Sequence, residues 1–149
     1  MLNIIQLQKE HIDSICEIEN ESFGDPWKKQ FFLDLFDSPF SVCFAAEDGA
    51  KVAGYLIAYH ISGEIQILNV AVKKSMRNKK IATKLFEAVF DYAKAEGAER
   101  FTLEVRQSND CALALYKKLG FTIDGIRKNY YRNPREDAVL MSKIQRRDK

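Results

Sequence analysis

The sequence is poor in the residues that separate domains. Its 149 residues include only three prolines and seven glycines, and no stretch rich in Gly, Ser or Pro divides the chain. With 46% hydrophobic and 30% charged residues, the composition is that of a folded protein and not of a disordered one. We therefore expect a single domain over residues 1–149.

Cysteine and histidine are also scarce. Cys16, Cys43 and Cys111 lie far apart and form no CxxC pair, so neither a disulfide framework nor a zinc site is predicted. We expect these cysteines to be free, buried thiols. His11 and His60 have no metal-ligand or triad spacing and are expected at ordinary surface or strand positions, so no metal is predicted.

Long apolar runs are missing. No run approaches the roughly 20 apolar residues that a membrane-spanning helix needs. Residues 1–9 lack the basic segment and the cleavage site of a secretory signal. These absences predict a cytoplasmic protein that has no membrane partner.

Acidic residues are absent from one segment. The formal net charge is only +2, but residues 65–86 contain no acid and carry +6, which leaves −4 for the rest of the chain. The six bases are Lys73, Lys74, Arg77, Lys79, Lys80 and Lys84. They lie where a predicted strand gives way to a predicted helix. Free N–H groups and the helix dipole already make that end positive, so added bases there indicate a bound phosphate. A solvated, lysine-rich turn is the alternative interpretation.

Hydrophobic periodicity predicts an α/β or α+β fold. We expect strands at residues 2–7, 40–47, 51–60, 64–73, 101–105, about 121–126 and 138–144, and helices at about 12–23, 28–36, 80–95 and 109–119. Turn signals at Asp48-Gly49 and Ser62-Gly63 predict antiparallel neighbours, and Gly97 is expected to end the third helix. A helix between the strands at 64–73 and 101–105 predicts a crossover, and hence a mixed sheet.

The basic segment resembles a known cofactor loop. The chain has neither a GxxxxGK[ST] nor a GxGxxG nucleotide-binding signature. Arg77-Asn78-Lys79-Lys80-Ile81-Ala82 instead resembles the pyrophosphate loop of the GNAT superfamily of acetyl-CoA-dependent N-acetyltransferases. That loop usually has Arg or Gln, two variable residues, Gly, one variable residue, then Gly or Ala. Arg77 and Ala82 match, whereas Lys80 stands where glycine is usual.

The resemblance extends over about residues 15–144, in order and without large gaps. The segments similar to the second half of the GNAT core are Leu103-Glu104-Val105-Arg106, Ser108-Asn109, Ala114-Leu115-Tyr116 and Leu119-Gly120-Phe121. The segments that resemble the branch acetylating protein N-termini, especially its bacterial RimI type, are Ile18, Phe23, Pro26-Trp27, Ile126-Arg127-Lys128-Asn129-Tyr130-Tyr131, Glu136-Asp137-Ala138 and Met141. The resemblance implies the GNAT fold, with a mixed sheet of about seven strands and about four helices.

The same resemblance implies where acetyl-CoA binds. The implied residues are Val70, Ala71, Val72, Arg77, Asn78, Lys79, Lys80, Ile81, Ala82, Thr83 and Asn109. Backbone groups of the strand at 69–72 would hold the pantetheine arm and the oxyanion, provided that this strand separates from the strand of Glu104. Asn109 is equally expected to cap the helix that it precedes.

Two residues are candidates for proton transfer. Glu104 lies on an otherwise apolar strand, where a carboxyl group faces either the core or a cleft, and burial would make it a better base. The resemblance implies that Glu104 is the general base, directly or through water, and that Tyr116 is the general acid. The alternatives are that Glu104 is solvated or paired with Arg106, and that Tyr116 is a core aromatic residue.

The acceptor amine is expected to bind residues Phe23, Pro26, Trp27, Tyr130, Tyr131 and Asp137. Glu21, Asp25, Glu136 and Asp137 make this region acidic, which suits a cationic peptide terminus. An α-amine has a pKa of about 7.7–8.0 and a lysine about 10.4, so a single carboxylate base favours an N-terminal acceptor.

The resemblance implies as acceptor the N-terminal alanine of a small-subunit ribosomal protein, modified by a monomeric enzyme with no specific nucleic-acid partner. Alternatives are another amine, namely a different N-terminus, a lysine or a polyamine, or a non-catalytic module that binds RNA through the basic loop and residues 143–149.

Overall fold

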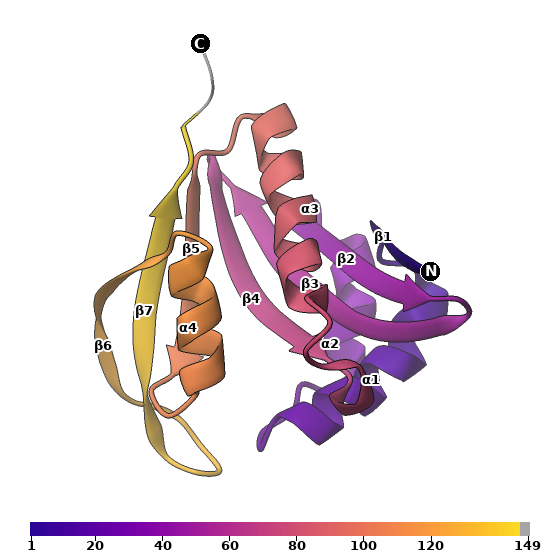
Figure 1. The fold of residues 1–149 in the computed structure, drawn as a ribbon, viewed down its shortest axis with the longest axis horizontal. Helices are drawn as coiled ribbons and strands as arrows, with labels where there is room; N and C mark the ends of the chain where they lie inside the picture. The colour runs from indigo at the N-terminus through magenta and orange to yellow at the C-terminus, as the bar shows by residue number, and fades with distance from the viewer. Residues whose placement is uncertain (147–149) are drawn as a thin grey trace.

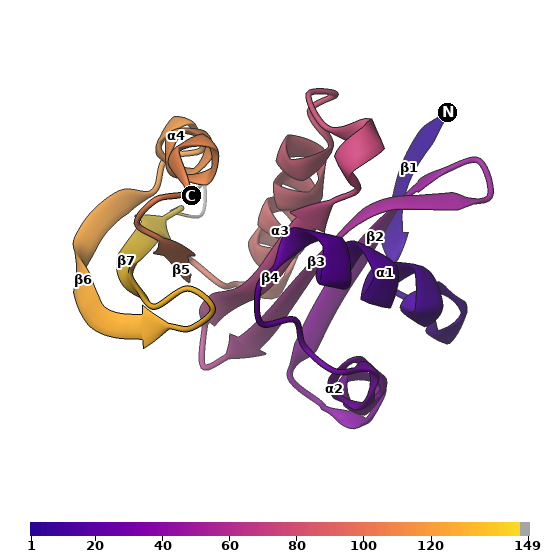
Figure 2. The ribbon, with the colours of Figure 1, turned by 90° about the horizontal axis from the view of Figure 1, so that it is seen from below.

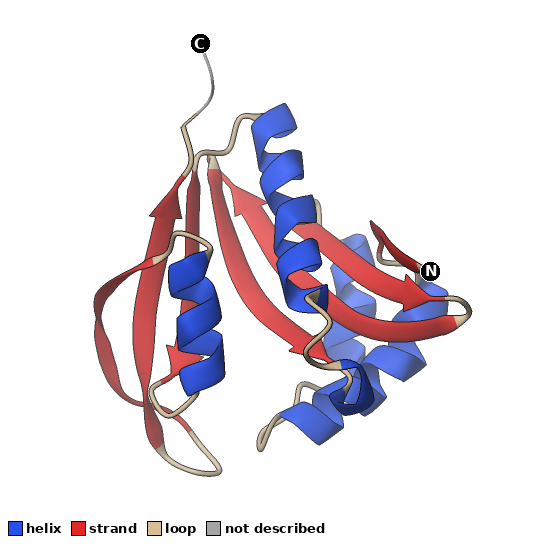
Figure 3. Cartoon of the chain, viewed as in Figure 1, coloured by secondary structure: helices blue, strands red, loops and turns tan. Residues whose placement is uncertain are grey.

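Within residues 1–146, which are those that the computed structural model describes, seven strands form one sheet in the order β1-β2-β3-β4-β5-β7-β6 (Figure 1). The strands are β1 (Leu2–Gln6), β2 (Ser41–Asp48), β3 (Lys51–Ile61), β4 (Glu64–Val72), β5 (Arg100–Arg106), β6 (Thr122–Tyr131) and β7 (Glu136–Ile144). The α-helices are α1 (Ile12–Ser22), α2 (Lys29–Asp34), α3 (Ile81–Glu96) and α4 (Asp110–Lys118). Short 3-10 turns cover Lys9–His11, Leu35–Asp37 and Lys74–Met76 (Figure 3).

The first half of the sheet is the predicted antiparallel meander. β1 pairs with β2, β2 with β3, and β3 with β4, all antiparallel. The chain then crosses over through α3 and returns as β5, parallel to β4. Gly97 ends α3 with a φ of 80°, a left-handed conformation that glycine adopts without a steric penalty. The predicted mixed sheet and α/β class are therefore confirmed.

The second half of the sheet is also antiparallel. β7 lies between β5 and β6 and pairs with both. β6 continues to Tyr131, five residues beyond the predicted end at about Ile126. The prediction stopped early because the polar run 127–129 has no apolar alternation, whereas pairing with β7 resumes at Tyr131 opposite Glu136. The expected tyrosine segment is thus the end of a strand.

Two hydrophobic cores occupy the two faces of the sheet, and Figure 2 shows α3 and α4 on one side and α1 and α2 on the other. On β5 the alternating Phe101, Leu103 and Val105 face the α3 side. The apolar stripe of α1, with Ile15 and Ile18 fully buried, faces the other side. Residues between the apolar positions of β5, including its carboxylate, therefore point away from α3 and α4.

The sheet divides between its two parallel strands. β4 and β5 pair only over residues 64–66 and 100–102, whereas β4 stays paired with β3 up to Val72 and β5 stays paired with β7 up to Arg106. β4 also has a register shift, with Asn69 opposite Ile57 and Ile67 opposite Ala58, so Leu68 is an extra residue. The two strands consequently diverge toward their C-terminal ends (Figure 1). The separation that the sequence resemblance implied is confirmed.

Some predictions on single residues need correction. The three cysteines are free as expected, but they are not fully buried: Cys16 and Cys43 are half-buried, and Cys111, on α4, is exposed. His11 is buried at the start of α1, where its Nδ1 accepts the Gln8 N–H and its Nε2 lies 3.0 Å from Glu47. The end of the 143–149 segment that the RNA-binding alternative invokes lies outside the described residues.

No helix within residues 1–146 is long and apolar enough to cross a membrane.

Candidate active site

The basic segment forms the turn that leads into α3. Lys80, the residue before the helix, has a φ of 60° and a ψ of 26°, and Asn78 has a φ of 67°. The Lys84 N–H bonds to the Lys80 carbonyl oxygen, so the N–H groups of residues 81–83 face out of the helix end. Lys80, the residue that departs from the family's loop pattern, therefore adopts the left-handed conformation that glycine favours.

Cationic side chains surround this helix end. Lys79 and Lys80 are exposed, and the exposed Arg77 donates from Nε to the Val72 carbonyl oxygen at 3.2 Å. That contact fixes the loop to the end of β4 and leaves the rest of the guanidinium free to bind an anion. The outward N–H groups and the positive charge suit the pyrophosphate of acetyl-CoA. Binding of the pyrophosphate by this turn stays a prediction.

Beyond Gln66, no strand within residues 1–146 pairs with the edge of β4 that faces β5. The backbone groups of Val70, Ala71 and Val72 lie in this stretch, between the bulge and the basic loop. An extended ligand can pair with such an edge as another strand would. The predicted site for the pantetheine arm is therefore continuous with the predicted pyrophosphate site.

Glu104 lies on β5, on the face opposite α3 and α4. Its side chain is 33% exposed and pairs with Arg127, with 3.5 Å between Oε1 and Nη1. Arg127 in turn lies over the Tyr130 ring at 5.0 Å, and hydrogen bonding to Glu104 raises the pKa of Tyr130. Glu104 is thus accessible to solvent and not in the core. Its cationic partner is Arg127 and not Arg106, which the alternative interpretation named.

Tyr116 lies on α4, with its ring 5.5 Å from Phe86 and 6.0 Å from Phe121. Its aromatic contacts are those of a core residue, as the alternative interpretation expected. Burial also raises the pKa of its phenol to about 12. The phenol therefore keeps its proton at neutral pH, as a proton donor must.

Both candidate catalytic residues affect the pKa of Tyr131. Burial raises its pKa, the charge of Glu104 and the phenols of Tyr130 and Tyr116 raise it further, and Arg106 lowers it. All of these groups therefore lie close enough to Tyr131 to act on its charge. Glu104 is thus close to Tyr130, and both Glu104 and Tyr116 influence the pKa of Tyr131, Tyr116 from the α4 side of the sheet.

Arg106 fastens the β6–β7 loop. It donates from Nη2 to the Arg132 carbonyl oxygen at 2.6 Å and from Nη1 to that of Pro134 at 2.8 Å. It also pairs with Glu136 at 3.3 Å and lies over the Tyr131 ring at 4.6 Å. One half-buried guanidinium thus joins the end of β5 to the segment expected to bind the acceptor.

The acids of the expected acceptor region are largely engaged in the fold. Glu136 also accepts the Ser108 N–H, and hydrogen bonding to the Ser108 side chain and backbone lowers its pKa. Asp137 accepts the Asn129 N–H at 2.8 Å, which lowers its pKa, and pairs with Lys128 at 3.4 Å. These carboxylates hold the hairpin together, so contact between Asp137 and an acceptor stays a prediction. Asn109 caps α4 as expected, accepting the Ala112 N–H at 3.2 Å.

The α1–α2 loop, residues 23–28, lies on the face of the sheet opposite α3 and α4, which is also the face of Glu104. Trp27 is half-buried, with its ring 4.1 Å from Phe31 and 5.9 Å from Phe32. Phe23 also packs against this core, whereas Gly24 is exposed. Phe23 and Trp27 thus pack against the core and hold the loop on it.

Sequence reasoning missed the carboxylate beneath this loop. Glu19 of α1 is 1% exposed and accepts hydrogen bonds from Trp27, Tyr55 and Asn69. Its position four residues after Ile15, on the apolar stripe of α1, was the available signal.

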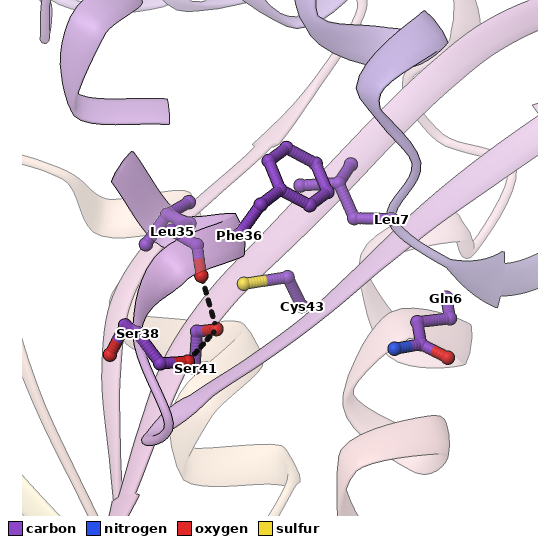
Figure 4. A pocket seen from close by; sticks show the side chains of 7 residues that line it. All are labelled: Gln6, Leu7, Leu35, Phe36, Ser38, Ser41 and Cys43. Carbon is purple, nitrogen blue, oxygen red and sulfur yellow. Dashed lines mark hydrogen bonds between the residues drawn. The ribbon is translucent and has the colours of Figure 1, made fainter. Parts of the chain in front are cut away.

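One concave pocket lies away from this region. Its volume is about 220 Å³, and it is lined by Gln6, Leu7, Leu35, Phe36, Ser38, Ser41 and Cys43 (Figure 4). β1 and β2 carry Gln6 and Cys43, and β3 and β4 separate them from β5. Burial raises the pKa of the Cys43 thiol to about 11, so this thiol is not activated as a nucleophile. The pocket plays no part in the site described above.

A mixed sheet that splits beside a cationic helix end is the arrangement of a GNAT-type acyltransferase, as the sequence resemblance implied. Comparison with known proteins agrees: residues 12–121 match the Acetyltransferase (GNAT) family, and the chain belongs to that family. The expected class, an N-acetyltransferase that uses acetyl-CoA, is thereby confirmed.

Two named relatives match this chain along nearly all of its length and of their own. An Escherichia coli protein named ribosomal protein bS18-alanine N-acetyltransferase is 30% identical over 144 residues, covering 95% of this chain and 97% of its own. A Bacillus subtilis protein that carries the same name provisionally is 38% identical over 136 residues, covering 91% of this chain and 90% of its own.

Solved structures agree with these relatives. The crystal structure of the Escherichia coli ribosomal-protein-S18-alanine N-acetyltransferase superposes with a TM-score of 0.91 at 29% identity, covering 100% of this chain and 97% of that one. Ard1 from Thermoplasma volcanium gives a TM-score of 0.90 at 26% identity, covering 97% of this chain and 98% of that one.

Proposed function

We propose that this enzyme acetylates the α-amino group of a protein N-terminus, and that its acceptor is the N-terminal alanine of ribosomal protein bS18. The observation that carries the proposal is the partly exposed Glu104 carboxylate on β5, the strand that separates from β4 beyond Gln66. The names of the relatives that match along nearly the whole chain supply the acceptor.

Glu104 and Tyr116 take the two proton-transfer roles. The acceptor nitrogen attacks the thioester carbonyl carbon, and Glu104 removes a proton from that nitrogen, directly or through water. The C–S bond then breaks, and Tyr116 gives its proton to the departing thiolate. Backbone N–H groups at residues 70–72 stabilise the oxyanion of the tetrahedral intermediate. The products are the acetylated amine and CoA, and the enzyme is restored when protonated Glu104 loses its proton to solvent and the Tyr116 phenolate takes one up.

An α-amine suits the electrostatics of this base. Glu104 is partly exposed and is paired with Arg127. An α-amine with a pKa of about 7.7–8.0 is already partly neutral at physiological pH, whereas a lysine at about 10.4 needs a stronger base. The site is therefore better matched to a chain terminus than to a lysine.

A peptide panel tests the acceptor. The purified enzyme is mixed with acetyl-CoA and a peptide that carries the bS18 N-terminus, and the product is located by mass spectrometry. We expect acetylation at the α-amine of alanine and none on the same peptide with a blocked N-terminus and a free lysine. Turnover confined to lysine or to free polyamines would contradict the proposal, and RNA binding without acetyl-CoA binding would contradict the enzymatic role.

The remaining assignments belong to the same proposal. Residues 1–149 form one domain that acts as a cytoplasmic monomer and binds no specific nucleic acid. Light scattering, which should give the 17.2 kDa monomer mass, tests the oligomeric state.

A further inference from the structure

We propose that Glu19 is a positioning residue that holds the α1–α2 loop against β4 at the split, and thereby sets the affinity for the acceptor. The inference rests on the proposed function, because it takes this loop to be one wall of the acceptor site. It concerns a residue outside the proton-transfer pair and outside the cofactor loop.

Glu19 is the charged member of an otherwise apolar face. It follows Ile12, Ile15 and Ile18 along the buried stripe of α1, and its side chain is 1% exposed. Burial raises the pKa of its carboxyl group. A leucine here would pack against the same core without any desolvation penalty, so packing alone does not account for a carboxylate.

All the partners of Glu19 are hydrogen-bond donors. The backbone N–H of Trp27 donates to Oε2 at 2.8 Å, while the Tyr55 hydroxyl and the Asn69 side-chain amide both donate to Oε1. Each oxygen is therefore committed, and a group that is itself a donor at Oε2 would oppose the Trp27 N–H.

The three donors come from three separate parts of the fold. Trp27 belongs to the α1–α2 loop, Tyr55 to β3, and Asn69 to β4 immediately after the bulge at Leu68. Asn69 is adjacent to Val70, where the backbone stretch proposed to hold the acetyl donor begins. The Glu19 carboxylate thus joins the loop proposed to bind the acceptor amine to the strand proposed to hold acetyl-CoA.

Ring contacts also join Trp27 to Tyr55 through Phe32. The Trp27 ring contacts Phe31 and Phe32, and Phe32 meets Tyr55 edge-on with 6.1 Å between ring centroids. Losing the bond from Glu19 to the loop backbone should release the loop while the sheet remains intact. The expected consequence is weaker acceptor binding with little change in acetyl-CoA binding.

Glu19→Gln tests the inference directly. The amide keeps one acceptor oxygen but loses the charge. Its NH₂ group either opposes the Trp27 backbone N–H or requires the Tyr55 hydroxyl and the Asn69 amide to turn over and accept. We expect the KM for the acceptor peptide to rise about tenfold, since hydrogen bonds to charged groups are the strong ones. The KM for acetyl-CoA should stay within about twofold of the wild-type value.

Trp27 is the only tryptophan in the chain, so its fluorescence reports on the loop without requiring activity. Acrylamide should quench this fluorescence more strongly in Glu19→Gln than in the wild type. Ile18→Val is the matched control, because it reduces packing one residue away on the same buried face and leaves the hydrogen bonds in place. If Glu19→Gln fails to fold, Tyr55→Phe removes a single donor and should raise the acceptor KM about threefold.

The possible outcomes are distinct. Wild-type quenching and an unchanged acceptor KM in Glu19→Gln would overturn the inference. An equal rise in both KM values, matched by Ile18→Val, would also overturn it, because that pattern is one of general destabilisation. Failure of the wild-type enzyme to acetylate the alanine peptide would contradict the proposed function, whereas Trp27 quenching would still decide whether Glu19 holds the loop.

Discussion

The backbone of Gly24 lies directly against the carbonyl oxygen of Asn133. A Cβ added at Gly24 would lie only 2.0 Å from that oxygen, far inside van der Waals contact. Gly24 belongs to the α1–α2 loop and Asn133 to the β6–β7 loop, which come from opposite sides of the split. The two segments expected to bind the acceptor therefore touch, and this contact requires a residue without a side chain.

Gly24→Ala should separate the two loops. The methyl group meets a backbone atom that cannot rotate away, so we expect a loss of about 1–3 kcal/mol in the free energy of unfolding. The acceptor KM should rise severalfold, and the dissociation constant of acetyl-CoA should not change. Gly125→Ala is the control, because its added methyl group points into open space. Equal effects of both substitutions in denaturation and kinetic assays would refute the role of the contact.

Glu104→Gln should lower kcat by about 10²–10⁴-fold, the usual contribution of a general base. The amide keeps the size of the side chain but cannot accept the proton. Calorimetry should give an unchanged acetyl-CoA affinity, because the residues proposed to bind acetyl-CoA lie on β4 and at the start of α3. Glu87→Gln, on the exposed face of α3, serves as the control. A wild-type kcat in Glu104→Gln would exclude Glu104 as the base.

Tyr116→Phe should lower kcat by about 10²-fold or more and leave both KM values nearly unchanged. The pKa of about 12 also predicts a pH dependence. The acid form is the active one, so rising pH removes the proton donor only near pH 12. Loss of kcat through Tyr116 deprotonation is therefore expected only at that high pH. A loss that begins near pH 9 and disappears in Tyr116→Phe would contradict this assignment.

Lys80→Gly should stabilise the protein. A left-handed conformation costs an L-residue roughly 1–2 kcal/mol, so the free energy of unfolding should rise by about 1 kcal/mol once the greater chain entropy of glycine is included. The loop backbone should be preserved and one cation lost.

The same substitution should weaken acetyl-CoA binding by up to about fivefold, with a smaller salt dependence. Calorimetry at two salt concentrations measures both effects, with Lys94→Ala near the other end of α3 as the charge control. Tighter binding in Lys80→Gly would mean that the lysine obstructs the phosphates.

Much of this fold could be predicted because its elements have strong local signals. α3 repeats apolar residues at helical spacing and ends at Gly97, and the meander strands are separated by turn residues. The resemblance supplied the proposed cofactor loop and the two proton-transfer candidates. It did not identify the partner of Glu104, because Arg127 is 23 residues away and reaches Glu104 only through the pairing of β7 with both β5 and β6.

The sequence by itself determined the order of the elements, the positive segment and the family, since each depends on neighbouring residues or on an ordered pattern. The tertiary structure alone decided that Glu19 is buried among Trp27, Tyr55 and Asn69, and that Gly24 touches Asn133. These contacts join residues 8 to 109 positions apart along the chain. Whether they form depends on the bulge in β4, the split from β5 and the packing of loops from two halves, which no local pattern encodes.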